Sequence, residues 1–362
     1  MPEYILDGTP TAIRHDSEGA TWIITQQGKV YKNGAVLLDI RNKLPPLRPV
    51  YEERGLLGLA LHPTILNRYY LMYTAQGTVV LNVVLGSTPP DTRWNEERYS
   101  TILVLEEYDG QQPVRKILQI KHPGFNHNGK DALSFRPSDG ALVWGLGDDG
   151  FAYDVFNLSQ RDEFIGGKIL AIQVDAIPAS IVPISRTAEL PSGVIVEAKG
   201  LRNPISLQYA KLGERELTFL TCPGQGNFEW VVAFEGKGQN FGWRTYEGPE
   251  RTKLPLGIAP NNDSDFAYHH PFLYYSHAQI NNLVGTVITG GRLIGTTFYF
   301  MDWQNGVYRC TPNLANLQQA VPFEQVVLPR KLSSYTSLGQ EGSTIWVAGI
   351  LNGKGYAYTY TP

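Results

Sequence analysis

One short motif occurs three times and constrains the fold of this chain more than any other feature of its sequence. It is an acidic residue and a glycine, followed by small or apolar residues and a tryptophan, at 18–22 (EGATW), 139–144 (DGALVW) and 341–346 (EGSTIW). An acidic residue and glycine before an alternating apolar segment are typical of a β-hairpin turn. Copies this far apart predict a repeated hairpin unit whose second strand buries its tryptophan, as in a radial array of small sheets.

The rest of the chain also indicates short strands and turns. It contains 37 glycines, 24 prolines and only 18% charged residues, which is typical of a turn-rich β protein rather than of helices or disorder. Strand-like segments, 78–86 and 101–109 among them, recur throughout the chain, and no long helix is indicated. We therefore predict an all-β fold, a six-bladed β-propeller with four-stranded antiparallel blades that occupies residues 1–362 as a single domain. The strand near residues 4–6 is expected to pair with the C-terminal blade and close the ring.

Charge and hydropathy limit the partners. The net charge of −3 without a basic run gives no electrostatic reason to expect nucleic acid or an anionic membrane, so a small molecule or a protein is the expected partner. No apolar run approaches the ~18 residues that a membrane span needs, and residues 1–20 do not resemble a signal peptide. The chain is therefore expected to be soluble, while its compartment and its oligomeric state stay open.

Two residue types invite a structural rather than a functional interpretation. Cys222 and Cys310 form no Cys-x-x-Cys unit, so a disulfide between them is possible and a metal site made of cysteines is not expected. His62 precedes a proline, and we expect it to cap the local backbone of a turn.

The chemistry is expected between residues 124 and 175. His127 stands just before one predicted strand, and Asp148 and Asp149 stand just after the next, so an antiparallel meander brings them to the same rim. A histidine with a carboxylate partner is what a general base and its orienting acid require. The alternative is a loop histidine bonded to backbone beside ordinary turn acids. The segment 145–150 (GLGDDG) formally matches a dinucleotide-binding loop, but its two carboxylates would repel a pyrophosphate and no amphipathic helix follows.

Several motifs occur together in one order along the chain. They are 53–63 (ERGLLGLALHP), 126–129 (NHNG), 147–148 (GD), 166–170 (GGKIL), 200–204 (GLRNP), and 240–243 (NFGW) with 247–248 (EG). Together they closely resemble the soluble quinoprotein glucose or aldose sugar dehydrogenase family, whose propeller is shared by Hedgehog-interacting protein. The resemblance extends from about residue 11 to about residue 358 and is most specific in the first two thirds of that range.

The resemblance implies an oxidoreductase that depends on pyrroloquinoline quinone (PQQ) and calcium and oxidises the anomeric hydroxyl of aldose sugars. It implies that His127 is the general base, that Asp148 orients it, and that Arg202 stabilises negative charge on the reduced quinone. The resemblance further assigns Asn203 and Glu53 to the cofactor site, the backbone carbonyls of Gly224 and Gln225 to a Ca²⁺ ion, and Glu229 to a second Ca²⁺.

The chain departs from the family pattern where late cations should bind the cofactor. Gln304 and Asn305 occupy the positions of a lysine and an arginine, and 332–334 (LSS) replaces an Arg-x-Arg pair. Gln304 is then the expected cofactor residue in this late segment, and Arg330 or Lys331 could replace the missing cations. Each lost charge-assisted bond would cost roughly 1.5–3 kcal/mol.

Two further features bear on the function. The central motif carries extra residues, Lys130 and Asp131 among them. The lost late cations support a second hypothesis, an inactive propeller that binds a protein or a glycan, for which four strand tyrosines (Tyr274, Tyr275, Tyr299 and Tyr308) would offer aromatic surface.

Overall fold

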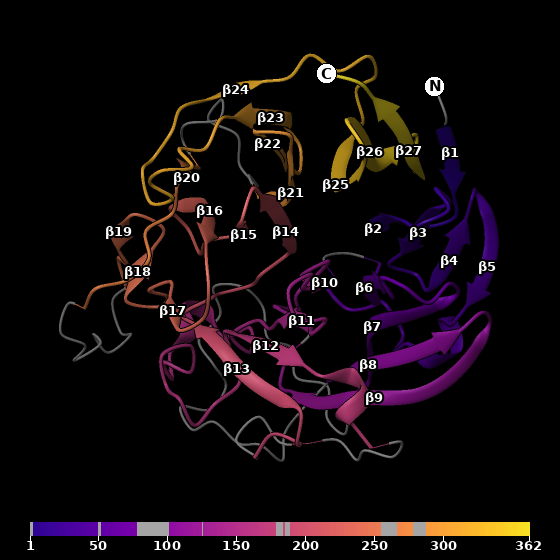
Figure 1. Ribbon diagram of the computed structural model, residues 1–362, viewed down its shortest axis with the longest axis horizontal. Helices are drawn as coiled ribbons and strands as arrows, with labels where there is room; N and C mark the ends of the chain where they lie inside the picture. Colours follow the sequence, from indigo (N-terminus) through magenta and orange to yellow (C-terminus); the bar gives the residue numbers. More distant parts are fainter. Residues whose placement is uncertain are drawn as a thin grey trace.

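Six antiparallel sheets stand in a ring, as Figure 1 shows. The computed structural model describes residues 3–49, 52–77, 101–124, 126–178, 184, 189–254, 266–277 and 287–362. In these ranges five sheets have four strands and one has five, with a separate two-stranded ribbon. The predicted all-β, six-bladed propeller is confirmed. The strand predicted at 78–86 lies outside the described residues.

Five blades are each built from strands in nearly continuous sequence order. Blade one contains β2 (Pro10–His15), β3 (Thr21–Thr25), β4 (Lys29–Lys32) and β5 (Ala35–Asp39), and blade two contains β6 (Leu56–Leu61), β7 (Arg68–Gln76), β8 (Thr101–Asp109) and β9 (Gln112–His122). Blade three contains β10 (Leu133–Phe135), β11 (Leu142–Gly145), β12 (Lys168–Ile172) and β13 (Val194–Lys199), and it is extended by the parallel strand β17 (Gln239–Asn240). Blade four contains β14 (Ser206–Leu212), β15 (Arg215–Cys222), β16 (Phe228–Phe234) and β20 (Leu273–Ser276), and blade five contains β21 (Ile288–Ile294), β22 (Thr297–Asp302), β23 (Gly306–Cys310) and β24 (Phe323–Gln325).

The sixth blade closes the ring with both ends of the chain. It contains β25 (Ser334–Glu341), β26 (Thr344–Leu351), β27 (Lys354–Tyr360) and the N-terminal β1 (Glu3–Leu6). Strand β1 pairs antiparallel with β27, with Tyr4 opposite Ala357, which confirms the predicted closure. Closure of this kind protects sheet edges that would otherwise be exposed. The ribbon of β18 (Tyr246–Glu247) and β19 (Glu250–Arg251) and the 3₁₀ turns η1 (Arg41–Lys43), η2 (Ala152–Asp154) and η3 (Val174–Ala176) complete the described elements.

The repeated motif forms the same hairpin in three blades. Trp22, Trp144 and Trp346 lie on the second strand of their blades and are at most 1% exposed, as predicted. The glycine of each turn has a positive φ, between +59° and +80°, and a Cβ added there would meet nothing within 4 Å. Glycine is therefore required at these turns by backbone conformation rather than by space.

Two smaller predictions can also be compared with the structure. The backbone N–H groups of Thr64 and Ile65 donate to His62 Nδ1 at 3.3 and 3.1 Å, so His62 caps its turn as expected. Cys222 and Cys310 are both buried and both free, so the disulfide that the sequence allowed does not form.

No helix in the described ranges is long and apolar enough to cross a membrane.

The innermost strands of the six blades are β2, β6, β10, β14, β21 and β25, and each begins its sheet. Because every blade has the same strand order, the segments that precede these strands lie at one end of the ring. This arrangement brings residues from distant parts of the sequence to one rim, where the predicted site is found.

Candidate active site on the propeller rim

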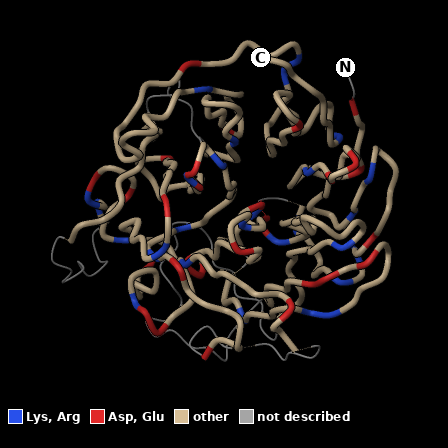
Figure 2. Tube along the Cα trace, in the orientation of Figure 1, with Lys and Arg blue, Asp and Glu red and all other residues tan. Residues whose placement is uncertain are grey.

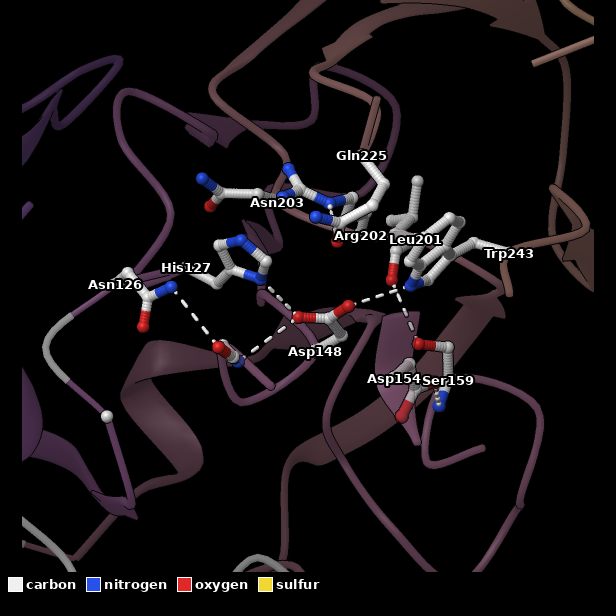
Figure 3. A network of polar contacts seen from close by, with 12 residues as sticks. Asn126, His127, Asp148, Asp154, Ser159, Leu201, Arg202, Asn203, Gln225 and Trp243 are labelled. Carbon is white, nitrogen blue, oxygen red and sulfur yellow. Dashed lines mark hydrogen bonds and ion pairs between the residues drawn. The ribbon is translucent and has the colours of Figure 1, made fainter. Parts of the chain in front are cut away.

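His127 and Asp148 are in direct contact, as Figure 3 shows. His127 lies in the loop before β10 and Asp148 in the loop after β11, and both side chains are completely buried. His127 Nδ1 bonds Asp148 Oδ1, while Trp243 Nε1 donates to Asp148 Oδ2 at 2.7 Å. The N–H of Gly150 adds a donor to Oδ1 at 3.2 Å. The carboxylate is thus held from three sides and fixes the orientation of the imidazole.

Glycines permit the two loops to approach each other this closely. A Cβ added at Gly147 would lie 2.0 Å from the carbonyl oxygen of His127, and one at Gly150 would lie 2.4 Å from Asn126 Oδ1. Asn126 Nδ2 donates to the Gly150 carbonyl at 3.2 Å. His127 and Asp149 themselves adopt positive φ, 53° and 80°. The segment 145–150 therefore serves loop packing around a histidine, not a phosphate.

The environment of His127 keeps its ring neutral. Burial is the main cause, and with the positive charge of Arg202 it lowers the pKa of His127 to about 3, against an opposing effect of Glu53. A neutral ring that donates from Nδ1 to Asp148 carries its lone pair on Nε2. Nε2 is buried and has no hydrogen-bond partner among the described residues. An unpaired buried acceptor is costly unless something else occupies it, so this atom marks a place for a ligand.

Glu53, Asn203 and His127 connect three neighbouring blades. Glu53 Oε2 accepts the His127 N–H at 2.6 Å and Asn203 Nδ2 at 3.3 Å. Asn203 Oδ1 accepts the N–H of Gly129 at 3.1 Å. These residues precede β6, β10 and β14, so the structure brings together three residues predicted for one site from positions 150 residues apart in the chain.

Arg202 lies beside this group. Its guanidinium is 6.0 Å from the ring centroid of Trp243, and its Nε donates to Gln225 Oε1 at 3.3 Å. A second nitrogen donates to the carbonyl of Pro223 at 3.4 Å. Arg202 is only 4% exposed and has no ion pair with a carboxylate among the residues described, so its charge remains available to an anionic or developing negative group.

The loop that contains Gly224 and Gln225 is shaped by one buried carboxylate, Glu247. Glu247 Oε1 accepts the N–H groups of residues 225, 226, 227 and 228 at 2.7, 2.8, 2.8 and 3.2 Å. In a trans peptide the carbonyl points opposite to the N–H, so the carbonyls of Gly224 and Gln225 point away from Glu247. Backbone carbonyls fixed in this way are hard donors of the kind that Ca²⁺ prefers. The described residues contain no group of three or more His, Cys, Asp or Glu side chains that could hold a metal.

Glu229 lies on β16 and is engaged by protein donors. It is 1% exposed, its Oε1 is 2.8 Å from His277 Nε2, and its Oε2 accepts the N–H of Ile288 at 3.0 Å. Burial raises the pKa of Glu229 to about 7. The residue predicted to serve a second Ca²⁺ thus uses both oxygens within the protein.

The late segment does not restore the expected cations. Gln304 is exposed in the turn between β22 and β23 and donates its N–H to Asp302 Oδ1 at 3.4 Å. Arg330 lies 3.2 Å from Glu3 at the outer edge of blade six, and Lys331 is exposed. Leu332 is buried in a hydrophobic cluster between blades five and six. The role of Gln304 at the cofactor therefore stays a prediction from the resemblance.

Three residues of the site received no role from the sequence. Trp243 and Glu247 belonged to recognised motifs, yet their contacts with Asp148 and with the 225–228 loop span many residues and left no local signal. Asp154, in η2, is 1% exposed and accepts the N–H groups of Leu158 and Ser159 at 2.8 and 2.9 Å. Burial, together with the charge of Asp148, raises the pKa of Asp154 to about 7.

Comparisons with known proteins place this geometry in a context. No family model matches the chain. Curated relatives are HIPL2 of Arabidopsis thaliana, 32% identical over 291 residues, and HIPL1 of the same plant, 26% identical over 287 residues. These matches cover 68% and 66% of this chain but only 40% of each relative, so the chain spans well under half of their length.

Two solved structures share the propeller. The PQQ-bound form of aldose sugar dehydrogenase from Streptomyces coelicolor matches with a TM-score of 0.66 at 18% identity, over 99% of this chain and 98% of that one. The holo PQQ domain of pyranose dehydrogenase from Coprinopsis cinerea matches with a TM-score of 0.55 at 12% identity, over 98% and 93%. The chain therefore has the propeller fold of the PQQ-dependent sugar dehydrogenases and a sequence similar to the HIPL proteins, as its motifs indicated.

Proposed function

We propose that this chain is an oxidoreductase of the PQQ- and Ca²⁺-dependent sugar dehydrogenase type and that it oxidises the anomeric hydroxyl of an aldose. The observation that carries the proposal concerns the buried, neutral His127: its Nδ1 is bonded to Asp148, and its Nε2 has no hydrogen-bond partner in the part of the chain that the structure describes. A carboxylate-aligned neutral imidazole presents the lone pair of its second nitrogen to a hydroxyl placed there, which is the geometry of a general base.

The residues around His127 have different roles in this reaction. His127 Nε2 takes the proton of the anomeric hydroxyl, and Asp148 stabilises the imidazolium that forms because it accepts the Nδ1 proton. Trp243, which donates to Asp148 at 2.7 Å, keeps that carboxylate in place. PQQ, when bound, would accept the hydride from the anomeric carbon, so one hydride and one proton leave the sugar and a lactone remains.

The donor set suits such a cofactor. Arg202 supplies a buried positive charge without a carboxylate partner among the described residues, and Asn203 supplies amide groups beside it. The carbonyls of Gly224 and Gln225, directed away from Glu247, are the oxygens that would hold Ca²⁺. Glu53 fixes the backbone of His127 and the side chain of Asn203.

The test is reconstitution with PQQ and Ca²⁺, followed by dye reduction with a panel of aldoses. His127→Gln is expected to lower kcat/KM by a factor of about 10² to 10⁴, which is the usual contribution of a general base. His62→Gln is the matched control, because His62 caps a turn elsewhere, and it should retain activity. Absence of both dye reduction and retained quinone absorbance in the unmodified protein would overturn the proposal.

A second candidate is a propeller that binds a protein or a glycan without catalysis. It is favoured by the exposed Gln304 and the buried Leu332 where the late cations were expected. The tyrosines do not support it equally, because Tyr275, Tyr299 and Tyr308 are buried in the core. A glycan array with the unmodified protein distinguishes the two candidates, since binding without dye reduction would favour the second.

A further inference from the structure

Three cationic side chains surround one carboxylate among the innermost strands of the propeller. We call Arg14, Lys130, Asp131 and Arg292 the axial cluster. Arg14 lies on β2, Lys130 and Asp131 just before β10, and Arg292 on β21, and Figure 2 shows basic and acidic residues among these inner strands. Asp131 Oδ1 is 2.5 Å from Arg14, and its Oδ2 is 2.6 Å from Arg292. Blades one, three and five thus meet at a single carboxylate.

Lys130 reaches from blade three to the other side of the ring. Its Nζ donates to the carbonyl of Thr289 at 3.2 Å and to that of Thr336, which belong to β21 and β25 of blades five and six. Lys130 follows His127 by three residues, so their Cα atoms are at most roughly 11 Å apart. The backbone of Lys130 therefore lies close to the site described above, and its ammonium group crosses to the inner strands of blades five and six.

The axial cluster has more positive than negative charge. Within the ranges that the structure describes, Asp131 is the only carboxylate paired with Arg14 or Arg292, and Lys130 bonds only carbonyl oxygens. The side chains of Arg292 and Asp131 are 6% and 5% exposed, and that of Arg14 is 18% exposed. Buried charge without a counter-charge is costly, and an anionic ligand would relieve that cost.

Burial is the main cause of the pKa shifts in the cluster. Burial is the main cause of the lowered pKa of Lys130, which falls to about 8 although Asp131 opposes the shift, while Arg292 contributes to it. Burial likewise lowers the pKa of Arg292 to about 10. Within the described part of the chain, one carboxylate thus faces the buried Arg292 and the partly exposed Arg14 and Lys130.

We propose that the axial cluster is an anion site that binds carboxylate groups of the quinone cofactor, in place of the late cations that this chain lacks. The inference rests on the proposed function. Lys130 and Asp131 are extra residues in the central motif, and the late positions hold Gln304 and 332–334 (LSS) instead of cations. Arginine and lysine at the axis supply the charge-assisted donors that a tricarboxylate needs.

The test measures binding rather than turnover. Equilibrium dialysis gives the Kd of PQQ, with Ca²⁺ present, for the unmodified protein, Lys130→Gln, Lys130→Arg and Arg330→Gln. Loss of one charge-assisted bond predicts at least about tenfold weaker binding for Lys130→Gln, partial recovery in Lys130→Arg, and no change in Arg330→Gln, whose side chain lies at the outer edge of blade six. Equal affinities for Lys130→Gln and the unmodified protein would overturn the inference while the proposed function stands.

A second arm uses citrate, a tricarboxylate without a quinone, and follows the shift in Tm. If citrate raises the Tm of the unmodified protein but not of Lys130→Gln, and PQQ does not bind, the anion site stands and the quinone assignment fails. If neither PQQ nor citrate binds, both proposals fail. Circular dichroism checks the folding of each variant. Should Lys130→Gln not fold, Arg14→Gln carries the same expectations, because its side chain is partly exposed.

Discussion

Glu247 offers the sharpest test of how the rim is built. Its carboxylate holds four consecutive backbone N–H groups through Oε1 and the amide of Asn227 through Oε2 at 2.8 Å. In Glu247→Gln the shape persists, but the acceptor loses its charge and one of its two oxygens. Charge-assisted bonds are about twice as strong as neutral ones, and five bonds that share one group are not additive. We expect the free energy of unfolding to fall by about 3 kcal/mol.

The assay is urea unfolding at pH 7, followed by the fluorescence of the seven tryptophans. The control is Glu250→Gln, because Glu250 is exposed and its ion pair with Lys253 is long, at 3.8 Å, so its loss should change stability by less than about 0.5 kcal/mol. The view that this carboxylate shapes the loop would be refuted if the free energy of unfolding of Glu247→Gln lay within about 0.5 kcal/mol of the unmodified protein, as expected for the control.

The same variant has a pH signature. Burial by itself would raise the pKa of Glu247, but the hydrogen bonds from Asn227 and from the backbone lower it overall, below its ordinary 4.5. A lowered pKa means that the stabilisation is complete above the unfolded pKa and is lost as the pH falls through the folded pKa. The difference in stability between the two proteins should therefore shrink as the pH falls below 4.5. If the carbonyls of Gly224 and Gln225 are Ca²⁺ ligands, Glu247→Gln should also bind Ca²⁺ more weakly than the unmodified protein, as measured by isothermal titration calorimetry.

Two further predictions concern close packing and titration. Gly147→Ala places a Cβ 2.0 Å from the His127 carbonyl oxygen and should lower the free energy of unfolding by about 2 kcal/mol or more. Gly226→Ala is the control, because its Cβ would meet only the Tyr153 hydroxyl at 3.9 Å and should change that free energy little. Equal urea midpoints for the two variants would contradict this prediction. Burial raises the pKa of Glu229 to about 7, so the folded protein keeps a proton on Glu229 that the unfolded chain loses near pH 4.5. The stability that this proton contributes is therefore lost as the pH rises from 4.5 to about 7. In Glu229→Gln, this decrease in the free energy of unfolding should be smaller by up to about 3 kcal/mol. The same pH dependence of unfolding in Glu229→Gln and in the unmodified protein would contradict the prediction.

Much of the fold could be predicted because its signals are local. The turn glycines at positive φ and the tryptophans that follow them repeat in sequence as they repeat in space. The pair of His127 and Asp148 was also predictable, since two adjacent strands of one meander bring their ends together. The proximity of Glu53 and Asn203 followed from the resemblance to a known family rather than from the residues alone.

Other contacts could not be predicted because they join segments with no local relation. Trp243 donates to a carboxylate 95 residues earlier in the chain. Arg292 and Arg14 meet Asp131 from distances of 161 and 117 residues. No periodicity or motif records such pairs, because they depend on which blades lie opposite each other in the closed ring.

The sequence by itself determined the repeated hairpin, the all-β propeller and the histidine and carboxylate at its rim, because strand periodicity and turn chemistry act over a few residues. Only the tertiary structure decided which side chains reach the axis, where the positive charge gathers and which carboxylates are occupied by protein donors. Those features depend on the closure of six sheets into one ring, which places residues from all parts of the chain within hydrogen-bonding distance.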